Sequence, residues 1–336
     1  MKQFSFRHTK EAELMDSITE KTRAEGMSEQ ELFSFAEFHK EDVERTGYSN
    51  YSYWGSTLRV FKKNKVAMLL VILLAALLVF TFIQPHLPGQ YDPNLIINDE
   101  NGMQYRNIPP GDQFILGTNS IGQDLWSRIW SGTRTSLIIG LSVALAEALI
   151  GITVGVLWGY VRKLDFLLTE VYNIIDNIPN TIVLILISYI MKPSVQTLIF
   201  AMCLTGWIQM ARFIRNQILI IRDRDYNVAS RCLGTPTWKI MIKNLLPYLV
   251  SVITLRMALT IPAAIGNEVF ITYIGLGLPV NIPSLGNLIE EGRALATSAA
   301  LRYQLLFPTI MLSFVTISFY IIGNAFSDAA DPKNHV

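Results

Sequence analysis

Long apolar runs without charge constrain this chain more than any other feature. Residues 66–83 form an 18-residue stretch that contains no charged side chain. At about 1.5 Å of rise per residue, a helix of that length covers about 27 Å, close to the roughly 30 Å hydrocarbon core of a bilayer. Five further apolar runs follow, at residues 135–158, 167–190, 195–214, 248–265 and 303–325. We therefore expect an all-α membrane protein with six transmembrane helices.

Composition agrees with a membrane protein. The chain is 51% hydrophobic and 16% charged, whereas soluble domains average roughly 25% charged residues. A net charge of +1 gives no bulk attraction for nucleic acid. Cys203 lies in an apolar run and Cys232 in a polar segment, so their depths differ and we expect no disulfide or zinc site. Because residues 1–57 are polar, we also expect no cleavable signal peptide.

Lysine and arginine predict the side on which each connection lies. Four cations precede the first apolar run, which places the N-terminus in the cytoplasm: Arg59, Lys62, Lys63 and Lys65. Six spans then place the C-terminus inside as well. The inside connections are residues 161–166 and the segment 215–247. The outside connections are 84–134, a tight turn near 192–193, and 266–302.

This topology divides the chain into four parts. They are a cytoplasmic N-terminal extension (1–57), the first transmembrane helix with a long exterior loop (58–134), a five-helix core (135–326) and a cytoplasmic tail (327–336). In the extension, Ser28 and Glu31 form a capping box before an apolar stripe, which predicts an amphipathic helix over about 28–43. That helix either lies on the membrane surface or against a partner subunit, or packs on its own subunit.

Three ionisable residues fall inside the predicted spans, namely Glu147, Asp176 and Arg256. Charged groups at membrane depth are costly and usually face a bundle interior or water. One interpretation is that they line a translocation path. The alternative is that they pair with neighbours or lie nearer to the membrane interface.

Glycine and proline predict how the helices pack and bend. Gly151 and Gly155 form a small-xxx-small step that suits close approach of a second helix. Pro179 and Pro262 lie in apolar runs and can kink them. Such kinks serve either as gates or as ordinary bends of a membrane bundle.

No enzyme site is expected. Gly117 and Gly122 have the glycine spacing of a P-loop, but Gln123 and Asp124 stand where lysine and a hydroxyl residue are needed. The four histidines all lie outside the spans and do not cluster: His8, His39, His86 and His335. We therefore predict no catalytic residue, no metal site and no bound cofactor.

The segment 225–247 is polar and basic and lies between two apolar runs. Gly234 interrupts its helical pattern and Pro247 closes it. A helix–glycine–helix element beside a membrane domain suits docking of a soluble partner. The segment resembles the coupling loop of ABC importer permeases, whose pattern is Glu-Ala-Ala, three residues, Gly, nine residues, and Ile-x-Leu-Pro. The matching positions are Ala229, Ser230, Gly234, Leu246 and Pro247, whereas Val228 replaces the usual Glu and Asn244 the usual Ile.

Three further segments extend the resemblance to about residues 58–332. Residues 116–141 resemble the "GTDxxGRDxxSRxxxGxRxSLxxG" segment of dipeptide and oligopeptide permeases, with Asn119 and Gln123 as departures. Residues 274–289 resemble an exterior stretch of the same family, and SDAADP at 327–332 resembles its C-terminal "DALDP". The chain is thus similar to the second permease of oligopeptide ABC importers, and it most resembles the oligopeptide permeases of Gram-positive bacteria.

This resemblance implies a type I importer permease fold with a cytoplasmic coupling helix. It implies a heterodimer with a second permease, two soluble subunits that bind ATP, an extracytoplasmic oligopeptide-binding lipoprotein and a peptide substrate, all at the cell membrane. Related permeases carry nickel or other small solutes, so the substrate class stays open.

An ion-coupled secondary transporter is the second hypothesis, since Glu147 and Asp176 would suit proton carriage, and a membrane-embedded hydrolase is the third.

Overall fold

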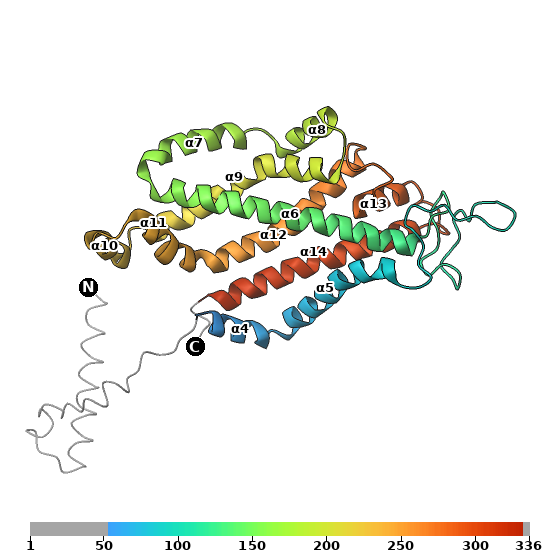
Figure 1. Cartoon of the computed structure of the whole chain (residues 1–336), viewed down its shortest axis with the longest axis horizontal. Helices are drawn as coiled ribbons and strands as arrows, with labels where there is room; N and C mark the ends of the chain where they lie inside the picture. The colour runs from blue at the N-terminus through green and yellow to red at the C-terminus, as the bar shows by residue number, and fades with distance from the viewer. Residues whose placement is uncertain (1–52, 332–336) are drawn as a thin grey trace, which may run out of the picture. The chain divides into compact units, whose positions relative to one another are not determined.

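A computed structural model describes residues 53–331 of the chain (Figure 1). This part is helical, and its long loop between the first two spans carries two isolated β-bridges, Asn98 with Gln104 and Thr118 with Asp124. The predicted amphipathic helix at 28–43 and residues 332–336 lie outside the described residues.

The helices follow one another along the chain with short connections at most positions. In order they are α4 (Tyr53–Lys63), α5 (Lys65–Ile83), α6 (Leu125–Tyr160), α7 (Arg162–Asp176), α8 (Asn180–Ile190), α9 (Val195–Ile221), α10 (Asp225–Cys232), α11 (Thr237–Ile240), α12 (Leu246–Tyr273), α13 (Leu285–Arg293) and α14 (Tyr303–Ala330). Two short turns complete the set, a 3₁₀ turn at Gln84–His86 and a π-helical turn at Met241–Leu245.

Five helical stretches are long and apolar enough to cross a membrane. They contain α5, α6, α9, α12 and α14, and the bent pair α7–α8 makes a sixth if it is one span. The predicted all-helical membrane architecture is therefore confirmed.

The third predicted span differs from a single helix. The apolar run at 167–190 predicts one continuous helix, but the structure has α7 and α8, which are bent by 71° at a short break. Pro179 lies in that break as the N-cap residue of α8. Proline disfavours helical geometry in the residue before it and lacks an amide hydrogen. The helix therefore ends at Asp176 and restarts at Asn180.

The second span begins well before its apolar run. α6 starts at Leu125, where the Asp124 carboxylate accepts a hydrogen bond of 2.8 Å from the amide of Ser127. This N-cap satisfies one of the free amides of the first helical turn. Polar residues in the first turns of α6 hide this start from a hydropathy analysis, so residues 125–134 are helix rather than loop.

The closest helix contact joins α6 to α9, which lie alongside each other in Figure 1. A Cβ atom added at Gly155 would lie 2.5 Å from the carbonyl oxygen of Ala211, and one added at Gly151 would lie 2.5 Å from Cβ of Met210. Gly159 makes a similar approach to Ile218. The predicted small-residue step at Gly151 and Gly155 is therefore a true helix–helix contact, and Gly159 extends it by one turn.

Two different sets of segments cover the ends of the bundle (Figure 1). The α10 end holds α10, α11 and α4, and the α13 end holds α13 and the loop between α5 and α6. At the α13 end, the buried guanidinium of Arg128 donates to Oε1 of Glu291 at 2.7 Å and to Oε1 of Gln123 at 2.6 Å. Burial raises the pKa of Glu291, and the charge of Arg128 opposes that rise. This ion pair fastens α13 to the first turn of α6.

The glycine contact generates a stability prediction. Gly155→Ala should lower the free energy of unfolding by about 1–3 kcal/mol, because its Cβ meets a backbone oxygen and the two helices must separate. Gly266→Ala in α12 is the matched control, since no atom lies within 4 Å of its Cβ position. Thermal unfolding of the purified chain in detergent measures both variants. Equal midpoints for Gly155→Ala and the parent chain would contradict the close contact.

Candidate functional site

Glu147 and Arg256 line the same cavity, which has a volume of about 190 Å³. Glu147 reaches it from α6 and Arg256 from α12. Four uncharged polar side chains from three helices share the lining: Asn180, Gln209, Thr260 and Asn267. The cavity thus combines a carboxylate, a guanidinium and three carboxamides within an apolar bundle. Such an arrangement offers hydrogen-bond donors and acceptors where the surrounding helices offer few.

Gly206 of α9 has no side chain, and this makes room for the Glu147 carboxylate. A Cβ atom added at Gly206 of α9 would lie 1.7 Å from Oε1 of Glu147. A larger residue at position 206 would therefore push the carboxylate out of its place. Glu147 and Gly206 face each other across the same α6–α9 contact that the glycines of α6 form one turn further on.

Asp176, the third predicted residue, lines a neighbouring cavity of about 200 Å³. Both cavities share Asn180, Gly206 and Gln209. The Gln209 amide donates a hydrogen bond to the Asp176 carboxylate. Arg212 lies 3.8 Å from the same carboxylate. The structure therefore brings all three predicted residues into two adjoining cavities, with Gln209 between them.

Sequence reasoning missed Glu268, which is fully buried in α12. Its carboxylate accepts hydrogen bonds from the hydroxyls of Ser136 at 3.0 Å and Thr272 at 3.3 Å. The Ser136 oxygen in turn accepts from the amide of Leu285 at 3.1 Å, in the first turn of α13. The apolar run ends at residue 265, so Glu268 was expected in a loop. The four-residue spacing to Thr272 was the available signal for a continuing helix.

The carboxamides of the cavity were missed as well. Asn180 and Gln209 lie in apolar runs, and Asn267 lies just beyond one. Hydropathy treats each as a single polar interruption, whereas their convergence depends on how α8, α9 and α12 pack. A search for amide side chains within spans would have found the first two.

At the α10 end, Gly234 closes α10 with a positive φ of 74°. Its amide donates to the Arg231 carbonyl, and the Thr235 amide donates to the Ser230 carbonyl, both at 3.0 Å. These two bonds are the Schellman pattern, which favours glycine because it has no Cβ. No other atom lies within 4 Å of a Cβ built at Gly234. Backbone geometry, and not crowding, therefore explains glycine at this predicted position.

Polar contacts hold α10 on the bundle. Asn227 is its buried residue and donates to the Ile221 carbonyl at 2.9 Å. The Asn244 amide donates to Oδ1 of Asn227 at 3.2 Å and to Oγ of Ser230 at 3.3 Å. Ser230, at an alanine position of the resembled pattern, and Asn244, which replaces its isoleucine, are thus partners. Pro247 follows the π-helical turn Met241–Leu245 within the continuous helical stretch Thr237–Tyr273, so the missing amide hydrogen of the proline falls next to an irregular turn.

The outer surface of α10 and α11 carries exposed apolar side chains. Leu233 is 85% exposed and Trp238 is 60% exposed. Ala229 is also exposed, next to the basic Arg231. Hydrogen bonds from Arg231 and from Arg222 lower the pKa of Asp223 between α9 and α10. Apolar side chains presented in this way at a helical projection mark an interaction surface.

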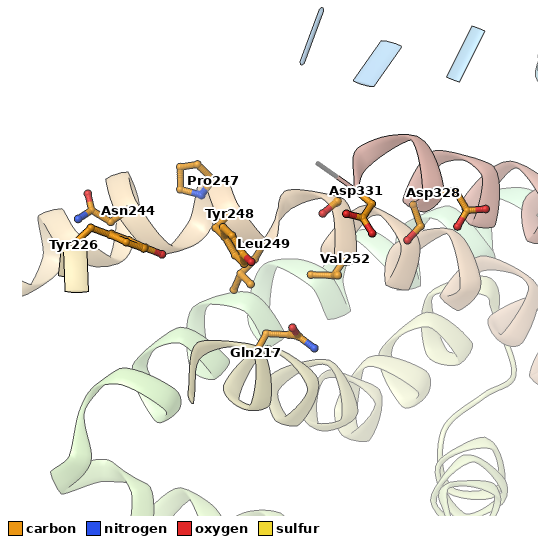
Figure 2. Close-up of a pocket in the computed structure, with 11 residues that line it drawn as sticks. Gln217, Tyr226, Asn244, Pro247, Tyr248, Leu249, Val252, Asp328 and Asp331 are labelled. Atoms are coloured by element: carbon orange, nitrogen blue, oxygen red, sulfur yellow. The ribbon is translucent and has the colours of Figure 1, made fainter. Parts of the chain in front are cut away.

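Figure 2 shows a cavity of about 630 Å³ beside this element. Tyr226 of α10 and Asn244 and Pro247 line one part of it. Asp328 and Asp331, from the end of α14, line another part. The cavity therefore brings the 225–247 segment next to the C-terminal SDAADP segment, although the two lie far apart in the sequence.

Comparison with known proteins gives two family matches. Residues 151–336 match the model "Binding-protein-dependent transport system inner membrane component". Residues 52–110 match the model "N-terminal TM domain of oligopeptide transport permease C". Together the two models include both the α10 end and the first span.

Three similar proteins come from Gram-positive bacteria. The chain is 39% identical to the oligopeptide transport system permease protein AmiD of Streptococcus pneumoniae, over 85% of this chain and 91% of that protein. It is 34% identical to the dipeptide transport system permease protein DppC of Bacillus subtilis, over 84% and 86%. It is 30% identical to the oligopeptide transport system permease protein OppC of Bacillus subtilis, over 90% and 97%.

Proposed function

The chain belongs to the family of binding-protein-dependent transport system inner membrane components, and from this premise we propose that it forms half of the pore of an ATP-driven oligopeptide importer. It is a multi-pass permease of the type I importer fold and a non-catalytic component of its transporter. The names of its relatives, two oligopeptide permeases and one dipeptide permease, support peptides as the substrate class.

The observation that carries the proposal is the exposed element formed by α10, Gly234 and α11. It is anchored to the bundle through Asn227 and Asn244, yet it presents Leu233 and Trp238 outward. A helical projection that is anchored in this way can transmit movement, because it cannot move without also moving the transmembrane helices to which it is bonded. We infer that it docks in a groove of a separate ATPase subunit and couples ATP-driven closure to the pore. Ala229, Ser230, Gly234, Leu246 and Pro247 are its proposed coupling residues.

A second permease subunit is the proposed partner within the membrane. Asn180 and Gln209 are exposed at the cavity that Glu147 and Arg256 line. Exposure of charged groups to lipid costs about 2.5–3.5 kcal/mol each on insertion scales. A second six-helix subunit would cover this face and complete the pore. Two ATP-binding subunits and an extracytoplasmic oligopeptide-binding lipoprotein complete the proposed importer.

The two adjoining cavities are the proposed wall of the translocation path. A peptide that leaves water must satisfy its backbone amides and carbonyls, and leaving such a group unpaired costs several kcal/mol. The carboxamides of Asn180, Gln209 and Asn267 offer both donors and acceptors without selecting a side chain. Glu147, Asp176 and Arg256 add charges of both signs beside them.

Reconstitution tests the docking proposal. The purified chain in liposomes should show neither ATP hydrolysis nor peptide uptake, and both should appear with a second permease, two ATPase subunits and the binding protein. In that system Leu233→Asp should lower co-purification of the ATPase subunits and uptake by tenfold or more, because a carboxylate replaces an apolar docking side chain.

Met103→Asp is the matched control, since Met103 is a 71% exposed apolar residue at the α13 end. It should leave co-purification of the ATPase subunits unchanged. Normal co-purification and uptake by Leu233→Asp would show that α10 is not the docking element. Uptake by the isolated chain under a proton gradient would support a secondary transporter instead.

Substitution within the polar cavity tests the path. Glu147→Gln and Arg256→Gln should each reduce peptide uptake by about tenfold, because each removes a charge that faces the cavity, while co-purification of the ATPase subunits stays normal. Glu170→Gln serves as a control, since Glu170 is an exposed acid of α7 that lines neither cavity. Full uptake by both cavity variants would remove these residues from the path.

Labelling with an impermeant thiol reagent tests the orientation. Cys232 is exposed on α10, so it should react only after cells are permeabilised if the α10 end is cytoplasmic. A cysteine at exposed Asn98 or Asn281, introduced into a Cys232→Ser chain, should react in intact cells. The reverse pattern would invert the proposed topology, in which both termini are cytoplasmic.

A further inference from the structure

α4 is a helix separate from the span that follows it. The Asn64 side chain accepts a hydrogen bond of 3.1 Å from the amide of Ala67 and caps α5, which begins at Lys65. α4 ends one residue before this cap, at Lys63. Because α5 is an apolar candidate span, its first residue lies near a membrane surface. The position of α5 therefore places α4 at the level of the lipid headgroups.

One face of α4 is fixed to the bundle. Phe61 is 8% exposed and packs edge-on against Phe326 of α14, with ring centroids 5.7 Å apart. Ala325 and Ala329 of α14 belong to the same apolar cluster. This packing holds α4 in one orientation about its axis, so the face opposite Phe61 is the exposed one.

The opposite face combines apolar and basic side chains in two rows. Residues four apart are neighbours on a helix surface. Leu58, which is 48% exposed, lies next to Lys62 in one row. Arg59 lies next to Lys63 in the other row, and both are exposed. An apolar margin beside a cationic strip is the pattern of a helix that lies in the membrane interface.

Within residues 53–331, no ion pair joins this strip to an acidic side chain. The sequence contains no Asp or Glu between Glu44 and Asp92, and Lys65 adds a fourth cation immediately after α4. Among residues 53–331, the ion pairs involve neither Arg59 nor the lysines of α4. Within the described part of the chain, the strip therefore presents unpaired positive charge at the height of the headgroups.

We infer that α4 is a binding surface for anionic phospholipid, with Arg59, Lys62 and Lys63 on the headgroup phosphates and Leu58 in the adjoining acyl region. Charge complementarity and the continuity of α4 with a membrane span both favour lipid over an acidic protein.

Native mass spectrometry of the full chain tests this inference. The purified protein is titrated with phosphatidylglycerol and, separately, with phosphatidylcholine of the same chain length. The triple variant Arg59→Gln/Lys62→Gln/Lys63→Gln should bind the first phosphatidylglycerol at least tenfold more weakly, since each cation near an anionic surface contributes roughly a fivefold factor. Binding of phosphatidylcholine should not change.

Two controls separate α4 from other sources of positive charge. Arg162→Gln/Lys163→Gln removes two cations at the start of α7, at the same end of the bundle, and should leave phosphatidylglycerol binding unchanged. Lys62→Arg/Lys63→Arg keeps the charge and should keep the binding. Parent-like affinity of the triple variant would overturn the inference. Displacement of the lipid by inorganic phosphate at equal concentration would also overturn it, because it would show a site for free anions.

Discussion

The rest of the bundle depends on the direct contact of α6 with α9. Gly151, Gly155 and Gly159 recur every four residues, so one row of α6 has no side chains and α9 approaches it closely. Glu147 occupies the preceding step of this row, and there the glycine is on the other helix, at Gly206. Along this row, the Glu147 carboxylate lies between the two helices, and the glycines that follow it let α6 and α9 come into direct contact. At this step the large residue, Glu147, lies on α6 and the glycine, Gly206, lies on α9, whereas at the next three steps the glycines lie on α6. This exchange leaves room for the Glu147 carboxylate and the polar cavity that it lines.

A single helix connects the functional parts. α12 begins beside Asn244 and Pro247, which line the cavity at the α10 end, carries Arg256 into the polar cavity, and buries Glu268 under α13. The hydrogen bonds of Glu268 through Ser136 fasten α13 to both α6 and α12. A displacement of the 225–247 segment would thus reach both ends through one continuous element, which is the physical requirement for a coupled pump.

Hydropathy predicted the spans because lipid imposes helices on long apolar runs, whatever the tertiary contacts. It did not predict the break between α7 and α8, since the polar residues of the bend interrupt the run at 167–190 only briefly and Pro179 was compatible with either a kink or a straight passage. It also placed Glu268 in a loop, because an apolar scale cannot distinguish a buried, hydrogen-bonded carboxylate from one in water. The individual residues Glu147, Asp176 and Arg256 were accessible to sequence reasoning. Their convergence with three carboxamides was not, because it depends on the packing of five helices, α6, α7, α8, α9 and α12.

Asn244, one of the two departures from the resembled coupling pattern, has a structural explanation that involves Ser230. Taken one at a time, Ser230 in place of alanine and Asn244 in place of isoleucine each introduce a polar group where the pattern is apolar. In the structure the Asn244 amide donates to the Ser230 hydroxyl and to Asn227, so each polar group has a partner. Because Ser230 and Asn244 are half-buried, their hydrogen bond contributes about 0.5–1.5 kcal/mol, the range of an ordinary intramolecular hydrogen bond. The hydrogen bonds of Asn244 therefore hold α10 on the bundle at a position where the isoleucine of the pattern would offer only apolar contact.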